Sequence, residues 1–424
     1  MLRALRQLES EGKPIRVALV GAGAMGVGIA WQIGRTPGMR LVAIADIDPT
    51  AAHRAAQAYR PPAHRSQPSA PGDPLVIDDA LSLLAQEAVG FDVLVEATNT
   101  IGFAAEVCLA AINRGVHVVL MNAEVDLAFG PLLLSEAQRH GVVVTSDAGD
   151  QHGVLMRMIE EIESWAFRIV MAGNIKGYLD RHATAQGLLE EARIRNLNPV
   201  QCCAYTDGTK LNIEMALVAN GTGLLPSARG MIGPAARRVE EVLELFDFDQ
   251  YPQTGVVDYI LGAEPGGGVF VVGHCDDPLQ QQYLKYYKLG AGPYYLFYRP
   301  YHLCHLETTR AIALAALYSR PVLQPTHAFT ADVYAFAKRE ILPGEVAAHG
   351  IGGDHAYGLV DRCTVADQEN MLPIALLEAH LGKVPQFRRA IPRDQPIRFE
   401  DVELPASPLF ELYTKTWQST RSNR

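Results

Sequence analysis

The stretch IRVALVGAGAMGVGIA, residues 15–30, decides the fold. Its first six residues are apolar or β-branched apart from Arg16, which is the pattern of a buried strand, and a glycine-rich turn then leads into an apolar helical run. A second strand pattern, LVAIAD, ends on Asp46, 20 residues after the last glycine of the turn. A G-x-G-x-x-G turn between strand and helix, followed by an acid at this distance, is typical of a dinucleotide-binding Rossmann domain.

Each glycine of the turn has a separate physical task. Gly21 permits the tight turn, Gly23 lets backbone N–H groups approach a pyrophosphate, and Gly26 lets helix and strand pack closely. Asp46 is placed to accept hydrogen bonds from the adenosine ribose, and its charge repels a 2′-phosphate. We therefore predict that NAD(H) is preferred, with NADP(H) still possible because Arg54 could swing toward the ribose.

Strand patterns that end in polar residues recur after this turn. They are FDVLVEATN (91–99), VHVVLMNAEVD (116–126) and VVVTSDAGDQHG (142–153), with helical patterns near 101–114 and 130–140 between them. This alternation predicts an α/β fold with a doubly wound parallel sheet, which binds ligands at the carboxyl ends of its strands. The Pro-rich segment 60–75 reads as an exposed loop. The predicted cofactor-binding residues are Gly21, Gly23, Ala24, Met25, Gly26, Asp46, Thr98, Asn99 and Asn122.

Composition restricts the class of protein. The 424 residues suffice for several domains, and the formal net charge of −10 disfavours a nucleic-acid partner. The six cysteines include no C-x-x-C pair, which is typical of reduced cytosolic thiols. The charged N-terminus lacks the apolar core of a secretory signal, and no apolar run reaches the roughly 18 residues of a membrane span. We expect a cytoplasmic protein without a membrane partner.

Several motifs together resemble the homoserine-dehydrogenase-like oxidoreductases with a C-terminal SAF module, and within them the group similar to 1-deoxy-D-xylulose 5-phosphate reductoisomerase. The motifs are VALVGAGAMG, VLVEATN, VLMNAEVD, DAGDQHGVLMRMIEE, AGNIKGYLDRHAT and YTDGTKLNIEMALVANGTG, with the SAF-like pair FAKREILPGEVAAHGIGG (336–353) and FRRAIPRDQPIRFEDVEL (387–404). The resemblance implies a Rossmann domain (1–150), a catalytic and dimerisation domain (151–330) and a SAF-like domain (331–424). It also implies a homodimer.

Three charged residues interrupt the apolar run at 204–220. Asp207, Lys210 and Glu214 would share one face of a helix over 207–217. They either cap and decorate a surface helix or point an acid and an amine into an active site. The apolar surroundings favour a buried helix, on which charged groups need partners or a function. The resemblance implies that an acid and a lysine one turn apart bind substrate, which matches Asp207 and Lys210.

Two further sets complete the candidate site. Lys176 lies in the glycine-containing turn of AGNIKGYLD, where its ammonium could approach an anion. Homoserine dehydrogenases have Asn-Lys where this chain has Asn122-Ala123-Glu124, so an amine is replaced by carboxylates. Glu124 with Asp126 or Asp147 would suit Mg²⁺ or Mn²⁺, or Glu124 would bind substrate hydroxyls. The predicted catalytic residues are Lys210, Asp207, Lys176, Glu124 and Glu214.

We interpret the chain as an NAD(P)-dependent oxidoreductase that transfers hydride to or from a small polyhydroxylated or sugar-like compound. The substrate could be the free compound or its phosphate. Lys210 and Lys176 would polarise the substrate oxygen and exchange its proton. One alternative is a reductoisomerase acting on 1-deoxy-D-xylulose 5-phosphate, which would need a metal ion. Another is a non-catalytic NAD-binding sensor or scaffold.

Overall fold

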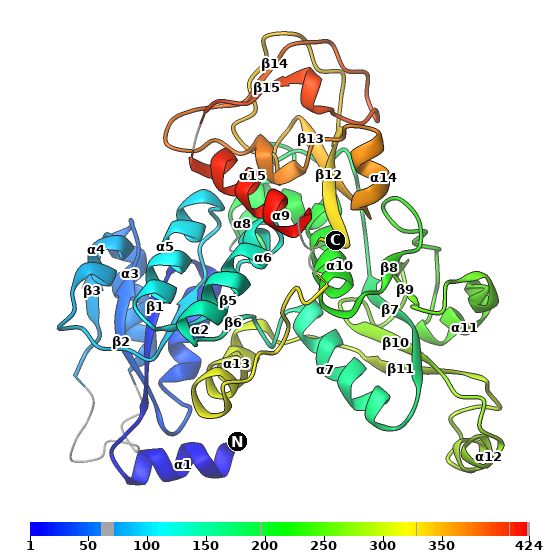
Figure 1. Cartoon of the computed structure of the whole chain (residues 1–424), viewed down its shortest axis with the longest axis horizontal. Helices are drawn as coiled ribbons and strands as arrows, with labels where there is room; N and C mark the ends of the chain where they lie inside the picture. The colour runs from blue at the N-terminus through cyan, green and yellow to red at the C-terminus, as the bar shows by residue number, and fades with distance from the viewer. Residues whose placement is uncertain (61–71, 196, 328, 407, 422–424) are drawn as a thin grey trace. The chain divides into compact units, whose positions relative to one another are not determined.

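The computed structural model describes residues 1–60, 72–195, 197–327, 329–406 and 408–421 (Figure 1). The chain forms two compact units, and each contains two separate segments of the sequence. The first unit comprises Met1–Gly153 and Leu303–Gln324, and the second comprises Val154–His302 and Pro325–Arg424. The loop predicted over 60–75 lies mainly outside the described residues, since only its ends are described.

The first unit is built on a six-stranded sheet with the order β3-β2-β1-β4-β5-β6. All neighbouring strands are parallel, and the chain reverses its direction across the sheet between β1 and β4. This is the predicted doubly wound α/β fold, and ligand sites in such sheets lie where the strand order reverses. The strands are β1 (Ile15–Val20), β2 (Met39–Ala45), β3 (Leu75–Ile77), β4 (Val93–Glu96), β5 (His117–Leu120) and β6 (Val144–Ser146).

Helices connect these strands, and one helix returns from later in the chain. They are α1 (Leu2–Ser10), α2 (Ala24–Ile33), α3 (Pro49–Tyr59), α4 (Ala80–Ala85), α5 (Gly102–Asn113), α6 (Ala123–His140) and the returning α13 (Cys304–Tyr318). Ala311, Ile312 and Ala313 of α13 belong to the same buried core as β1 and α2. A Cβ on Gly28 would lie 2.7 Å from His305 Cγ, so α2 and α13 pack very closely. This small-residue packing explains why 303–324 joins the nucleotide-binding unit, whereas the sequence placed it with the middle domain.

Two boundaries in the first unit differ from those predicted. The strand expected over 116–126 ends at Leu120, and α6 begins at Ala123 instead of near 130. Asn122 is the N-cap of this helix, and its side chain accepts a hydrogen bond from the Val125 N–H at 3.2 Å. Glu124 and Asp126 therefore lie in the first turn of α6 and not at a strand end. Negative charges in the first turn interact favourably with the positive end of the helix dipole.

The second unit contains a mixed five-stranded sheet with the order β11-β10-β7-β9-β8. Its strands are β7 (Arg168–Lys176), β8 (Leu225–Pro226), β9 (Val256–Leu261), β10 (Val269–His274) and β11 (Tyr294–Arg299). Its helical segments are α7 (Gln151–Ser164), α8 (Leu189–Arg195), α9 (Pro199–Thr206), α10 (Thr209–Thr222), η2 (Val239–Glu241), α11 (Val242–Leu245), η3 (Phe248–Gln250) and α12 (Pro278–Tyr286). Every residue from Thr209 to Asn220 of α10 is buried, so the surface-helix interpretation of this segment is wrong.

The C-terminal part of the second unit packs on α10. It contains β12 (Ala331–Ala337), β13 (Ala356–Arg362), α14 (Cys363–Gln368), η4 (Ile374–Leu377), β14 (Gln386–Phe387), η5 (Phe399–Asp401), β15 (Val402–Glu403) and α15 (Pro408–Arg421). The strands β12 and β13 form an antiparallel pair, and both contact α10. The predicted SAF-like segments pair with each other through bridges between Ile341 and Ile391 and between Phe336 and Pro396. The contacts with α10 unite residues 331–424 with the middle of the chain in one compact unit.

Candidate functional site

The glycine turn of the first unit has the geometry that a dinucleotide needs. Gly21 has a φ of +92°, and a Cβ there would lie 2.6 Å from the Ala97 carbonyl carbon. A Cβ on Gly26 would lie 2.0 Å from the Gly21 carbonyl oxygen, so only glycine fits at either position. A Cβ on Gly23, in contrast, would meet nothing within 4 Å. The space beside Gly23 is therefore open for a ligand.

The helix that follows the turn offers backbone donors to an anion. Gly23 is the N-cap of α2, and no side chain caps this helix end. Ala24 and Met25 are the first helical residues, whose N–H groups have no acceptor within the helix. An uncapped helix N-terminus beside open space suits a pyrophosphate. The predicted residues of this turn thus fit a dinucleotide.

Asp46 directly follows β2 and is tied to the glycine turn. Its carboxylate accepts the N–H of Ala22 at 2.6 Å through Oδ2 and the N–H of Asp48 at 2.8 Å through Oδ1. These two bonds fix the orientation of a half-buried carboxylate and leave further lone pairs for ribose hydroxyls. The preference for NAD(H) that this acid predicts stays a prediction.

Asp46→Ala should shift the cofactor preference toward NADP(H). Removing the carboxylate removes both an acceptor for the ribose hydroxyls and the charge that repels a 2′-phosphate. We expect the ratio of the NADPH to the NADH dissociation constant to fall by about tenfold, equivalent to ~1.4 kcal/mol. Fluorescence titration of both cofactors measures this ratio. Tighter binding of NADPH than of NADH by the wild-type protein would disprove this role of Asp46.

The rim beyond β4 is organised around a buried acid, Glu96. Glu96 is fully buried, and its Oε1 accepts the Thr98 N–H at 2.9 Å. Burial raises its pKa to about 7, against the opposing hydrogen bonds of Thr98. The Asn122 Nδ2 donates a hydrogen bond to the Thr100 carbonyl at 2.7 Å, at the other end of the loop that follows β4. Thr98 and the exposed Asn99 thus lie in a loop held from both ends, and the sequence had not singled out Glu96.

The three predicted metal ligands do not form a cluster. In the described part of the chain, Glu124, Asp126 and Asp147 are not among groups of three side chains whose ligand atoms lie within 4.8 Å of one another. Buried Asp126 accepts a hydrogen bond from the Ser146 hydroxyl, and burial raises its pKa to about 6. Asp147 Oδ2 accepts the Gly149 N–H at 2.6 Å, and burial raises its pKa to about 7. A site made by Glu124 with one of these acids and substrate oxygens is not tested by this criterion, so the metal stays a prediction.

Asp207 lies at the junction of two helices and not inside one. It is the C-cap of α9, and Gly208, with a φ of +86°, separates it from α10. The helix predicted over 207–217 therefore begins at Thr209, because a left-handed residue cannot continue a right-handed helix. Asp207 Oδ1 accepts the Thr209 N–H at 2.8 Å, so the carboxylate caps the start of α10.

Three of the remaining predicted catalytic residues belong to the same unit as this junction, whereas Glu124 lies in α6 of the first unit. Lys210 and Glu214 lie one turn apart on α10 and are both buried. Lys176 ends β7, and its ammonium donates to the Tyr205 carbonyl at 2.9 Å. Burial lowers the pKa of Lys176, while the charges of Glu214 and Asp207 oppose that shift and so lie near it. The second unit thus brings Lys176, Asp207, Lys210 and Glu214 together.

A residue without a predicted role, Lys338, completes the cluster. Its Nζ lies 2.8 Å from Asp207 Oδ2, and the two side chains are 2% and 0% exposed. Burial lowers the pKa of Lys338, but the Asp207 carboxylate and Cys203 together outweigh burial and raise it overall. Burial raises the pKa of Asp207, and the Lys338 ammonium acts against this rise. The sequence offered one sign that this lysine is buried, because Lys338 directly follows the strand run ADVYAFA.

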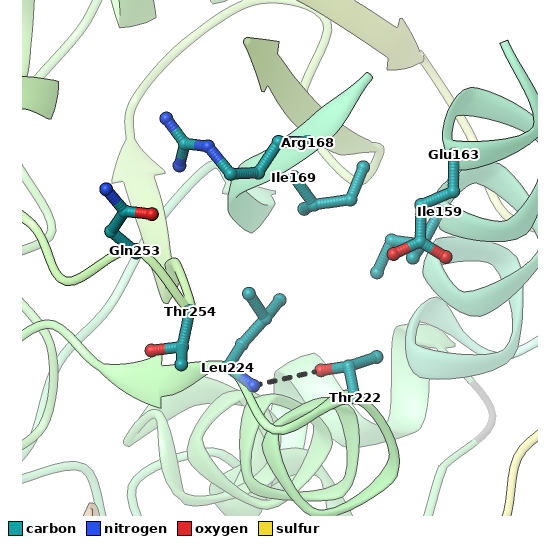
Figure 2. Close-up of a pocket in the computed structure, with 8 residues that line it drawn as sticks. All are labelled: Ile159, Glu163, Arg168, Ile169, Thr222, Leu224, Gln253 and Thr254. Atoms are coloured by element: carbon teal, nitrogen blue, oxygen red, sulfur yellow. Dashed lines mark hydrogen bonds between the residues drawn. The ribbon is translucent and has the colours of Figure 1, made fainter. Parts of the chain in front are cut away.

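Two hollows in the second unit lie apart from these residues. Figure 2 shows a pocket of about 200 Å³ near the ends of α7 and α10. Its lining comprises Ile159, Glu163, Arg168, Ile169, Thr222, Leu224, Gln253 and Thr254. An open hollow of about 650 Å³ is lined by Arg238, Glu264, Pro265 and Gly266. No predicted catalytic residue lines either of these two hollows. We therefore place the candidate site at the charged residues around Asp207 and not at a cavity.

Comparison with known families identifies the region that holds this cluster. Residues 149–308 match the catalytic domain of oxidoreductase DRL. The matched region contains Lys176, Asp207, Lys210 and Glu214, but neither the glycine turn nor Lys338. The predicted resemblance is confirmed for these residues. No curated protein matches the sequence.

Solved structures give weaker overall similarities. A homoserine dehydrogenase from Thiobacillus denitrificans is 16% identical over 78% of this chain and 83% of its own, with a TM-score of 0.43. A hyperthermophilic archaeal homoserine dehydrogenase in complex with NADPH is 13% identical over 72% of this chain and 98% of its own, with a TM-score of 0.43. An oxidoreductase from Agrobacterium radiobacter in complex with NAD⁺, L-tartaric acid and magnesium is 14% identical over 39% of this chain and 45% of its own, with a TM-score of 0.30.

Proposed function

We propose that this NAD(P)-dependent oxidoreductase, whose residues 149–308 form a DRL-type catalytic domain, transfers hydride to or from a small polyhydroxylated or sugar-like substrate. The observation that carries the proposal is a group of charged residues in that domain: Asp207, Lys210 and Glu214 are buried, and the half-buried Lys176 lies near Asp207 and Glu214. Amines and carboxylates are rarely buried together without a function. NAD(H) is the preferred cofactor in this proposal because Asp46 is fixed at the end of β2.

The lysines supply the polar half of the reaction. A bound nicotinamide supplies or accepts the hydride. The ammonium of Lys210 polarises the substrate carbonyl and stabilises the alkoxide that develops on its oxygen. Because burial lowers the pKa of Lys176, against the opposing charges of Glu214 and Asp207, its amine releases a proton more readily than an exposed lysine and is the candidate to exchange the proton with that oxygen. Asp207 and Glu214 balance the charge of the nearby ammonium groups.

A substrate panel tests this function. NADH oxidation and NAD⁺ reduction should be followed with polyols, sugars, sugar acids and sugar phosphates, each at several protein concentrations. A rate that is proportional to protein concentration with at least one member is the expected result. Saturable NADH fluorescence with no turnover of any member would favour the sensor or scaffold alternative instead.

Turnover should survive exhaustive removal of divalent ions. In the described residues Glu124, Asp126 and Asp147 do not form a group of three with ligand atoms within 4.8 Å of one another, and Asp126 and Asp147 each accept a hydrogen bond within the protein. We expect the rate after dialysis against EDTA to stay within about twofold of the untreated rate. A catalytic metal ion supplies several kcal/mol of transition-state stabilisation, so its removal would lower the rate far more than twofold. Loss of turnover with EDTA and its return with Mg²⁺ or Mn²⁺ would contradict this expectation. That outcome would favour the reductoisomerase acting on 1-deoxy-D-xylulose 5-phosphate.

The quaternary structure and cell compartment belong to the proposal as well. We propose a cytoplasmic homodimer whose contacts come from residues 151–330, a SAF-like role for 331–424, and no nucleic-acid partner for a chain of net charge −10. In the part of the chain that the structure describes, none of the helices has the length and apolarity needed to span a membrane.

A further inference from the structure

We infer that Lys338, in the C-terminal part of the second unit, is a positioning residue that holds the Asp207 carboxylate in its ionised form and in one orientation. The inference rests on the proposed function, because it assigns to Lys338 an effect on the reaction through Asp207. It gives residues 331–424 a direct part in the site, although the DRL-type match ends at residue 308.

The contacts of Lys338 leave its ammonium no room for another task. The Nζ lies 2.8 Å from Asp207 Oδ2 and donates to the Gly353 carbonyl at 2.7 Å and to Cys203 Sγ at 3.1 Å. An ammonium has three N–H donors, and these three partners use all of them. Lys338 itself is only 3% exposed, so it reaches the reaction only through Asp207.

The strands that carry Lys338 are fastened to the catalytic helix. The Thr209 hydroxyl accepts the Gly358 N–H at 2.9 Å, and Asn212 Oδ1 accepts the Val360 N–H at 2.8 Å. Asn220 exchanges two hydrogen bonds with the backbone of Ala331, at 2.9 and 3.0 Å. Polar side chains along α10 therefore bind both β12 and β13. Lys338, one residue beyond β12, is fixed relative to Asp207 by the same contacts.

Electrostatics explain why Asp207 needs this partner. A carboxylate that is 2% exposed favours its neutral form unless an opposite charge is close. Asp207 Oδ1 accepts the Thr209 N–H and Oδ2 faces Lys338, so both oxygens are oriented. Loss of the ammonium would remove the opposite charge that lies 2.8 Å from this buried acid, so its pKa would rise further. At a given pH less of it would be ionised, and activity that needs the anion would recover only at higher pH.

A double-mutant cycle tests the inference, with the substrate that wild-type enzyme turns over best. Lys338→Met should lower kcat by about tenfold and move the acidic limb of the pH–rate profile to higher pH. In an Asp207→Asn background, the same change should alter kcat by less than about twofold and leave that limb in place. Lys338→Arg, which keeps the charge, should retain the wild-type limb. Lys383→Met, at an exposed lysine of the same C-terminal part, is the control and should match wild type.

Four outcomes would overturn the inference. Equal losses of kcat in both backgrounds would mean that Lys338 does not act through Asp207. Coupling of the two residues in urea unfolding without coupling in kcat would make the ion pair purely structural. Wild-type turnover of no panel member would overturn the proposed function and this inference together, whereas normal turnover by Lys338→Met would overturn this inference alone. If Lys338→Met does not fold, kcat and the pH–rate profile of Asp207→Asn are compared with those of the double variant, and those of Lys338→Arg with those of the wild type.

Discussion

Lys210→Ala should lower kcat by about 10²-fold or more and leave the NADH dissociation constant nearly unchanged. The first effect is the scale expected when a group that transfers or stabilises a proton at the reacting oxygen is removed. The second follows because the glycine turn and Asp46, the predicted cofactor-binding residues, belong to the other compact unit. Steady-state rates and NADH fluorescence titration on the same preparation separate the two effects.

A matched control separates chemistry from folding. Lys285 is an exposed lysine in the last turn of α12, in the same unit as Lys210. Lys285→Ala should keep the wild-type kcat, and thermal unfolding should show that both variants are folded at the assay temperature. A folded Lys210→Ala protein with the wild-type rate would mean that Lys210 only supports the structure of α10.

Gly23→Ala should weaken NADH binding by about tenfold or more without lowering the melting temperature. The added Cβ meets no atom within 4 Å, and Gly23 has a φ of −65°, which alanine adopts without strain. The new methyl group would occupy the space where the backbone must approach a pyrophosphate. Calorimetric titration with NADH measures the affinity. Unchanged affinity would mean that the open space beside Gly23 is not where the dinucleotide binds.

Gly26→Ala gives the contrasting pattern at a neighbouring glycine. Its Cβ would lie 2.0 Å from the Gly21 carbonyl oxygen, so α2 would have to move away from the turn. We expect the free energy of unfolding to fall by about 1–3 kcal/mol, the usual cost of overpacking. The comparison of the two variants shows whether the turn is built for the ligand at Gly23 and for packing at Gly26.

The nucleotide-binding half could be predicted from the sequence because its signals are local. The turn at 21–26, the strand before it and the acid at 46 lie within one continuous stretch, and each residue acts through its own backbone or next neighbours. The boundary of α6 was missed because Asn122 and Glu124 read equally well as a polar strand end and as a helix start. In the structure, the Asn122 side chain accepts a hydrogen bond from the Val125 N–H, so this segment begins a helix.

The catalytic cluster was only partly predictable because its contacts join distant segments. The spacing of Lys210 and Glu214 showed a shared helix face, but the left-handed turn at Gly208 removed Asp207 from that helix. Lys338 follows Asp207 by more than a hundred residues, and no local pattern links them. The pairing comes from packing of β12 and β13 on α10, which the sequence pattern did not show.

The most direct test of the account is isotope transfer from the cofactor. Protein, NADH carrying deuterium at the transferable position, and the best carbonyl substrate of the panel are incubated, and the alcohol product is analysed by mass spectrometry. The account predicts a product one mass unit heavier than with ordinary NADH, with formation reduced by about 10²-fold in Lys210→Ala. A product that forms without gaining deuterium, or that forms equally fast in Lys210→Ala, would contradict hydride transfer at the Lys176–Lys210 cluster.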